Sequence, residues 1–282
     1  MSPLQQEVLL QMRLRGFADS TFEAYIHAMK ELWQFHKRPL EKLSCRDVQL
    51  FLDEIITVRK RSWATVNVYF SALRFLYGQV LKRTVCEFSI PPRGRSGRRP
   101  GVLSREEVSR IIAAPRSLKH RALLAMVYGS GLRVSEAVRV RIPDIDRGRM
   151  MLLVKAGKGR KDRYTVLSSH ALKMLEALWR KERPAEYFFA SKQRGEPVCS
   201  HTAQRIYHEA LRVSGVRHVG GIHVLRHCFA THLMEDGVDV YTVKRWMGHT
   251  SLATTSGYMH VTDTHMAKIR SPLDTIPSPG DL

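Results

Sequence analysis

Four short stretches in the second half of the chain place cationic or nucleophilic side chains next to apolar, helix-forming segments. The first covers residues 129–137 and reads GSGLRVSEA. Its two glycines permit a tight turn, and Arg133 then stands at a helix start, where its guanidinium can bind a phosphate through paired hydrogen bonds. Glu136 follows one turn later and can hold the Arg133 side chain in place. An ordinary helix start with an exposed ion pair has the same pattern, so this stretch alone assigns no chemistry.

The second stretch is a predicted β-hairpin. Its turn, residues 157–162, reads GKGRKD and lies between two β-rich segments at 149–156 and 163–167. Lys158 can reach a phosphate from this turn or donate a proton to a leaving oxygen. A lysine in such a turn is also commonly just solvated, so both interpretations stay open at this point.

The third stretch reads HVLRH and covers residues 223–227. His223 and Arg226 stand three residues apart and therefore share one face of a helix. The spacing of the two histidines is also that of a metal-binding pair. The zinc signature, however, needs a glutamate directly after the first histidine, and Val224 occupies that position. We therefore expect no metal here.

The fourth stretch covers residues 246–260, in which His249 follows a glycine and Tyr258 follows a Ser-Gly pair. A phenol surrounded by cations is a competent nucleophile, whereas an isolated tyrosine is more often a packed ring with its hydroxyl at the edge. The sequence contains no Walker loop, serine-elbow motif or carboxylate pair that competes with these four stretches. We therefore expect neither a nucleotide triphosphate nor another cofactor.

The chain that must position these residues has 282 residues and a formal net charge of +20. Such an excess of positive charge favours polyanions, either nucleic acid or an anionic membrane surface. With 44% hydrophobic and 26% charged residues, the composition is that of a globular protein and excludes a disordered acidic chain. The sequence shows no membrane-spanning apolar run and no secretory signal, and its four scattered cysteines are typical of reduced thiols. These features predict a soluble intracellular protein.

The pattern of apolar residues in the first part of the chain predicts a helical domain. Apolar residues recur at helical spacing through residues 1–88, which we read as a four-helix domain. Three of these helices have an expected cap, one near Ser20 and the others at Ser44 and Ser62, each before a periodic run.

The composition and pattern of the remaining residues predict a linker and a second domain. Residues 89–103, rich in proline, glycine and arginine, form the linker. Residues 104–282 begin with a capping box at Ser104, contain the hairpin, and end in a loose tail. The helices expected in this second domain cover residues 120–128, 134–140, 169–181, 202–213, 225–234 and 240–247. The fold class is therefore expected to be mainly α with a small β-sheet.

Taken together and in order, the four stretches resemble the tyrosine recombinase family, also called phage integrases. The resemblance rests on GLRVSE, GKGRKDR, HVLRHxFATHL and MGHxSLxTTxxYxH, and it spans nearly the whole chain. The chain is similar to the compact two-domain Xer, integron and transposon-encoded enzymes. The resemblance implies a helical core-binding domain at 1–88 and a catalytic domain at 104–282, which together form a C-shaped clamp around DNA.

The resemblance also implies a role for each candidate residue. Tyr258 would be the nucleophile that attacks a DNA phosphate, giving a 3′-phosphotyrosyl link and a free 5′-hydroxyl. Arg133 and Arg226 would bind the non-bridging oxygens of that phosphate, because their permanently charged forks suit the pentacoordinate transition state. Lys158 would protonate the leaving 5′-oxygen, with the other hairpin lysines as alternatives for that role.

The remaining residues would support this reaction. His223 would act on the Tyr258 proton or hydrogen-bond the phosphate, and His249 would supply a further hydrogen bond. Glu136 would be a supporting residue. Contacts to DNA are expected from basic residues of the linker and hairpin, Arg93, Arg95, Arg98, Arg99, Arg160 and Lys161.

These roles imply a site-specific recombinase that cuts and rejoins DNA through a phosphotyrosyl intermediate and a Holliday junction, without ATP or metal. Its partners would be double-stranded recombination sites, accessory DNA-bending or directionality proteins, and further copies of the chain. We expect a monomer or dimer when free, a homotetramer in the synaptic complex, no membrane partner, and a location in the prokaryotic cytoplasm at the nucleoid. Two alternatives stay open: a DNA-relaxing enzyme like a type IB topoisomerase, and a non-catalytic DNA-binding regulator.

Overall fold

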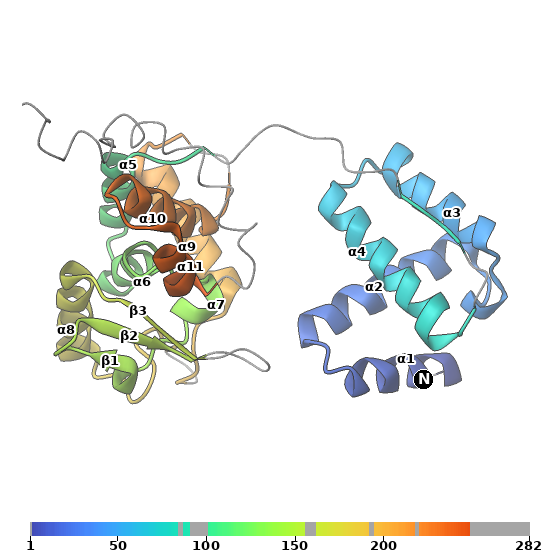
Figure 1. Ribbon diagram of the computed structural model, residues 1–282, viewed down its shortest axis with the longest axis horizontal. Coiled ribbons are helices and arrows are strands. Elements are labelled where there is room, and N and C mark those ends of the chain that lie inside the picture. Colours follow the sequence, from blue (N-terminus) through green and yellow to red (C-terminus); the bar gives the residue numbers. More distant parts are fainter. Residues whose placement is uncertain are drawn as a thin grey trace, which may run out of the picture. The chain divides into compact units, whose positions relative to one another are not determined.

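The structure is a computed structural model that describes residues 2–83, 87–90, 101–155, 162–191, 195–217 and 220–248. The chain divides into two compact units, Met1–Arg98 and Arg99–Leu282 (Figure 1). None of the helices in the described ranges is both long enough and apolar enough to cross a membrane.

The first unit is helical, and serine caps set the starts of several of its helices. Its elements are α1 (Pro3–Leu14), α2 (Asp19–His36), η1 (Leu40–Lys42), α3 (Cys45–Asp53), η2 (Glu54–Val58), α4 (Trp63–Arg74) and η3 (Phe75–Val80). Ser44 and Ser62 each accept a hydrogen bond from the backbone N–H three residues later, so these two predicted caps are confirmed. The cap expected near Ser20 is Ala18, two residues earlier, which has an extended backbone and makes no side-chain cap hydrogen bond, and α2 begins at Asp19. The Asp19 carboxylate in the first turn provides a favourable charge for the helix dipole instead.

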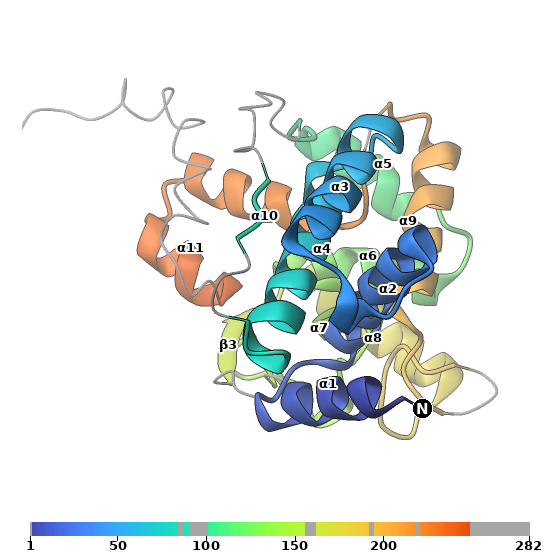
Figure 2. The same ribbon diagram turned by 90° about the vertical axis from the view of Figure 1, so that its right-hand side faces the viewer.

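The core of the first unit lies where α2, α3 and α4 pack against one another (Figure 2). Leu32, Phe51, Leu73 and Tyr77 are fully buried there. The Tyr77 hydroxyl donates a hydrogen bond of 2.9 Å to the carbonyl oxygen of Leu40, so the polar atom of this buried ring is paired. The unit therefore has a hydrophobic core of its own.

Cys45, the first residue of α3, is disulfide-bonded. Cys199 and Cys228 in the second unit are free thiols. The prediction of four reduced thiols is therefore wrong for Cys45. That prediction rests on the wide spacing of the cysteines along the sequence, and spacing does not decide which residues meet after folding.

The second unit is built around one helix whose second half is buried on every side. Its elements are α5 (Arg105–Ala113), α6 (Leu118–Gly129), α7 (Val134–Ala137), η4 (Ile142–Asp144), β1 (Ile145–Asp146), β2 (Met151–Val154), β3 (Arg163–Val166), α8 (Ser169–Glu182), α9 (Ser200–Ser214), α10 (His223–Glu235) and α11 (Val240–Met247). Residues 122–127 of α6 are all buried, which is typical of a helix surrounded by others. Helices α5, α8, α9 and α10 pack around α6 (Figure 1).

A small antiparallel sheet with strand order β1-β2-β3 flanks these helices. Leu152 of β2 pairs with Thr165 of β3, so the predicted hairpin strands are confirmed, while β1 was not predicted. Strand alternation turns Tyr164 outward and buries Thr165. The Thr165 hydroxyl donates to the carbonyl oxygen of Ser130 at 3.0 Å and so ties β3 to the turn after α6.

The predicted fold class, mainly α with a small sheet, is confirmed. The Ser104 capping box is present, because the Ser104 hydroxyl accepts from the Glu107 N–H and the Glu107 carboxylate accepts from the Ser104 N–H. The helix predicted at 134–140 is shorter than expected and ends at α7. Beyond α7 the carbonyl oxygen of Val140 accepts a hydrogen bond from the N–H of Phe188, and this distant partner draws the chain out of the helix.

Most of the predicted linker, 89–103, and the whole predicted tail, 271–282, lie outside the described residues. The four linker arginines, Arg93, Arg95, Arg98 and Arg99, are among them. The domain boundaries at 88 and 104 therefore stay predictions.

Candidate active site

The site begins at the turn that follows α6. Gly131 has a left-handed backbone with φ +60°, and a Cβ at this position would lie 2.3 Å from a ring carbon of Phe229 on α10. A side chain here would be strained at this φ and would have to displace the Phe229 ring, so glycine is favoured. The turn lets α6 and α10 approach each other and leads directly to Arg133, the N-cap residue of α7.

Arg133 and Glu136 are paired at the start of α7. Arg133 Nη1 lies 2.8 Å from Glu136 Oε1, and the Arg133 backbone N–H donates to Oε2 at 2.9 Å. Arg133 Nη2 also donates to the carbonyl oxygen of Gly248 at 3.0 Å. With 25% of its side chain exposed, Arg133 is held on one side and accessible on the other.

Arg226, on α10, is 1% exposed and lies on the inner side of the site. Its guanidinium donates to the carbonyl oxygens of Gly131 and Met247. Its Nη1 is 3.7 Å from Glu136 Oε2. The candidate residues of the first and third stretches are therefore neighbours in space, although Arg133 and Arg226 stand 93 positions apart in the sequence.

Sequence reasoning misses a third arginine, Arg163, the first residue of β3. Its Nη1 and Nη2 bind the two oxygens of Glu136 at 3.0 and 2.8 Å, and its Nε donates to the carbonyl oxygen of Trp246 at 2.8 Å. The signal that could have found it is strand alternation. Arg163 stands two residues before Thr165 and so lies on the inward side of β3, where a charged side chain needs an anionic partner.

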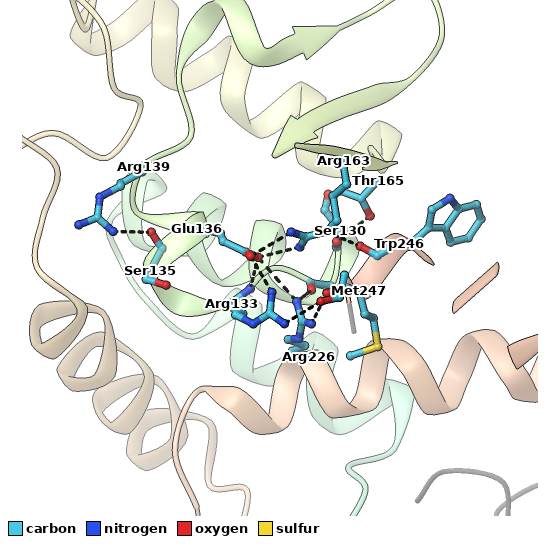
Figure 3. Close-up of polar contacts among 12 residues, drawn as sticks. Ser130, Arg133, Ser135, Glu136, Arg139, Arg163, Thr165, Arg226, Trp246 and Met247 are labelled. Atoms are coloured by element: carbon cyan, nitrogen blue, oxygen red, sulfur yellow. Dashed lines mark hydrogen bonds and ion pairs between the residues drawn. The ribbon is translucent and has the colours of Figure 1, made fainter. Parts of the chain in front are cut away.

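Glu136 is the carboxylate on which the three guanidinium groups converge (Figure 3). It accepts four hydrogen bonds from Arg133 and Arg163, which fills the lone-pair sites of a carboxylate. Burial alone would raise the pKa of Glu136, but the hydrogen bonds and charge of Arg163 and the hydrogen bonds of Arg133 outweigh it and lower the pKa to about 2. Glu136 is therefore ionised at neutral pH, and this cluster combines three positive charges with one negative charge.

His223 is the first residue of α10 and keeps more exposure to solvent than the three residues that follow it. Its ring centroid lies 5.1 Å from that of His227, with the rings perpendicular. Partial burial of the imidazole, together with the charges of His227, Arg226 and Arg133, lowers the pKa of His223 to about 4. The imidazole is therefore neutral at pH 7 and can accept a proton.

Several predicted site residues lie outside the described residues: Lys158, Arg160, Lys161, His249 and Tyr258. The described segments next to them in sequence do reach the cluster. Arg163 follows the hairpin turn directly, and Gly248, the residue before His249, accepts a hydrogen bond from Arg133. In the described part of the chain, no group of three or more His, Cys, Asp or Glu residues is arranged to hold a metal ion.

Comparison with known proteins identifies the family. Residues 101–265 match the phage integrase family, and residues 4–87 match the phage integrase N-terminal SAM-like domain. A protein of Sinorhizobium fredii named as an integrase/recombinase is 32% identical over 281 residues, which cover 99% of this chain and 91% of the relative. The tyrosine recombinase XerC of Lactobacillus leichmannii is 28% identical over 89% of this chain and 92% of its own length.

A solved structure shows the same fold. The Tn1549 transposon integrase, in complex with a circular intermediate DNA, superposes with a TM-score of 0.74 at 16% identity, over 94% of this chain and 99% of that one. With two family domains covering most of its length, the chain belongs to the phage integrase family, the tyrosine recombinases. It is a site-specific DNA recombinase, and the resemblance read from the four motifs is confirmed.

Proposed function

We propose that the arginine cluster around Glu136 binds the scissile phosphate of DNA and that Tyr258 cuts the strand there. The Tyr258 oxygen attacks phosphorus, the bond to the 5′-oxygen breaks, and the strand end remains as a 3′-phosphotyrosine. The leaving 5′-oxygen takes a proton from Lys158. A 5′-hydroxyl from a second strand then attacks the phosphotyrosine and releases Tyr258, so the covalent intermediate conserves the bond that rejoining needs.

The charge of the cluster carries this proposal. Three guanidinium groups share one carboxylate at a place where Arg163 and Arg226 are largely shielded from water. Three positive charges and one negative charge leave an excess of two, and excess charge in a protein interior is costly until an anion balances it. A phosphodiester supplies that anion and offers oxygens to paired N–H donors. The same charges stabilise the further negative charge that develops as phosphorus becomes pentacoordinate.

Arg133 and Arg226 take the two non-bridging oxygens in this proposal. Arg133 reaches the phosphate from its exposed side. Arg226 donates to the carbonyl oxygens of Gly131 and Met247, which hold it on the inner side of the site.

Proton transfer falls to the histidines and the hairpin. His223 is neutral at physiological pH, because its pKa is lowered to about 4. It acts on the Tyr258 proton or hydrogen-bonds the phosphate. His249 adds a hydrogen bond to the phosphate. Glu136 supports the reaction by holding the arginines.

The proposal extends to the assembly. Residues 1–88 act as the core-binding domain, residues 104–282 as the catalytic domain, and the basic linker 89–103 contacts DNA, as do Arg160 and Lys161 on the hairpin. The free protein is a monomer or dimer, and four copies join two duplexes in the synaptic complex with accessory DNA-bending or directionality proteins. The net charge of +20 supports extensive contact with DNA, and we propose that the protein acts at the nucleoid in the cytoplasm.

A strand-exchange assay tests this function. Two duplexes of different length, made from DNA that flanks the gene, are mixed with the protein, and the strands are sized on a denaturing gel. We expect hybrid strands with the wild type and none with Tyr258→Phe, which still binds the DNA. Relaxation of supercoiled DNA without hybrid strands would support the topoisomerase alternative, and tight binding with neither activity would support the regulator.

A further inference from the structure

Arg163 joins three segments that reach the site from different parts of the chain (Figure 3). It stands at the start of β3, directly after the hairpin turn. Two hydrogen bonds connect it to Glu136 on α7, and its Nε connects it to the carbonyl oxygen of Trp246 near the end of α11. The segments that lead to Lys158 and His249 are therefore tied to the carboxylate that holds Arg133.

The backbone carbonyl oxygens at the end of α11 accept hydrogen bonds from all three arginines. Three consecutive backbone carbonyls each accept a hydrogen bond from a different guanidinium: Trp246 from Arg163, Met247 from Arg226 and Gly248 from Arg133. The last carbonyls of a helix lack partners within the helix and carry its partial negative charge. The position of this helix end therefore sets the spacing of the three arginines.

The chain packs closely against the guanidinium group and the aliphatic part of the Arg163 side chain. The side chain is only 12% exposed. Gly248 has φ +62°, and a Cβ there would lie 2.9 Å from Cδ and 3.0 Å from Nε of Arg163. The chain at Gly248 thus lies directly against Arg163. A lysine has a single ammonium and cannot bind two carboxylate oxygens and a carbonyl in one plane.

From these contacts we infer that Arg163 is a positioning residue of the recombination reaction. It fixes Glu136 and the end of α11 so that Arg133 and Arg226 meet the phosphate in the reactive geometry. Its own hydrogen bonds go to Glu136 and Trp246, so it acts through these groups. The inference rests on the proposed function, which assigns the phosphate to Arg133 and Arg226.

The test measures single-turnover cleavage of a nicked suicide duplex from the flanking DNA, at saturating protein. The variants are Arg163→Gln, Arg163→Lys, Glu136→Gln and the double variant Arg163→Gln/Glu136→Gln. The matched control is Arg141→Gln. Arg141 binds both oxygens of Asp144 at 3.1 and 3.0 Å, a fork of the same kind that lies outside the cluster. DNA affinity and melting temperature are measured for each variant.

We expect Arg163→Gln and Arg163→Lys to lower the cleavage rate about 10- to 100-fold, because a small misplacement of reacting groups has effects of this size. DNA affinity should stay within about threefold, since charge elsewhere dominates binding. Arg141→Gln should lower the melting temperature and leave the cleavage rate unchanged. Because Arg163 acts largely through Glu136, the loss from Arg163→Gln should shrink to a few-fold in the Glu136→Gln background.

A pH profile separates positioning from folding. Without Arg163, we expect the pKa of Glu136 to rise, because burial raises it and the Arg133 hydrogen bonds remain to lower it. The cleavage rate of Arg163→Gln should therefore fall more steeply than that of the wild type as the pH is lowered from 8 to 5.5, and the double variant should lack this additional fall. The other groups that face Glu136 are Arg133 from α7 and Arg226 from α10. His223, also on α10, has its pKa lowered to about 4 and stays neutral in this range.

Each remaining outcome is decisive. If Arg163→Gln and Arg163→Lys cleave like the wild type, or if the losses from Arg163→Gln and Glu136→Gln multiply, the positioning role is overturned. If Arg163→Gln does not fold, Arg163→Lys, which keeps charge and most of the volume, decides alone. If the wild type forms no adduct that Tyr258→Phe abolishes, the proposed function fails and the positioning role fails with it.

Discussion

The three arginines of the site share Glu136 but differ in their access to solvent. Arg133 keeps an exposed side, Arg163 is turned toward Glu136 and α11, and Arg226 is fully buried. A phosphate that approaches from solvent therefore meets Arg133 first. At the scale of single residues, accessibility identifies Arg133 as the first arginine to meet DNA, while the contacts of Arg163 and Arg226 decide their roles.

We expect Arg133→Gln to lower the single-turnover cleavage rate about 10²- to 10³-fold, because it removes a charged donor that is already in place for the transition state. The control is Arg139→Gln. Arg139 is exposed, donates to the carbonyl oxygen of Ser135, and lies away from the cluster in Figure 3. A cleavage rate for Arg133→Gln equal to that of the control would contradict phosphate binding by Arg133.

The lowered pKa of His223 leads us to expect that the stability of the folded chain depends on pH. Its pKa is about 4 in the folded chain against an ordinary value of 6.5, so between these values the unfolded chain binds a proton that the folded chain does not. Stability is therefore lost as the pH falls from 6.5 to 4. We expect the melting temperature of His223→Gln to fall less over this range than that of the wild type. His201→Gln, at an exposed position on α9, is the control, and equal slopes for His223→Gln and wild type would show that His223 does not contribute.

At the scale of elements, short-range sequence patterns predict those features of the helices that short-range contacts determine. The Ser104 capping box and the apolar run of α6 are both readable, because each involves residues within one or two turns. The early end of α7 depends on Phe188, and the partners of Arg163 are 27 and 83 residues away in sequence. The periodicity of a sequence contains no information on such distant contacts. The candidate residues were therefore predicted individually from the sequence, whereas their arrangement around one carboxylate is seen only in the structure.

The turn at Gly131 decides how α6 and α10 meet. We expect Gly131→Ala to lower the free energy of unfolding by about 1–3 kcal/mol, because the new methyl group would overlap the Phe229 ring. Gly78→Ala is the control, since a Cβ at Gly78 meets no atom within 4 Å and its φ is not positive. Urea denaturation of both variants checks this. Equal stability of Gly131→Ala and wild type would mean that the turn and Phe229 move apart freely.

At the scale of the whole molecule, a net charge of +20 makes DNA binding an electrostatic event. If about 6–10 phosphates are contacted, affinity should fall about 10³- to 10⁵-fold between 50 and 200 mM salt, because bound counterions are released from the DNA. Fluorescence anisotropy with a labelled duplex at several salt concentrations measures this slope. A flat response would contradict binding through phosphate contacts.

The central claim, that Tyr258 forms a 3′-phosphotyrosyl bond at the arginine cluster, is tested most directly by mapping the covalent adduct. The wild type is incubated in EDTA with a nicked suicide duplex from the flanking DNA, the adduct is digested with trypsin, and the DNA-linked peptide is sequenced by mass spectrometry. We expect the peptide 246–268 with a nucleotide joined through its 3′-phosphate to Tyr258, and no adduct from Tyr258→Phe. An adduct at another residue, a link to a 5′ end, or an adduct that persists in Tyr258→Phe would contradict the claim.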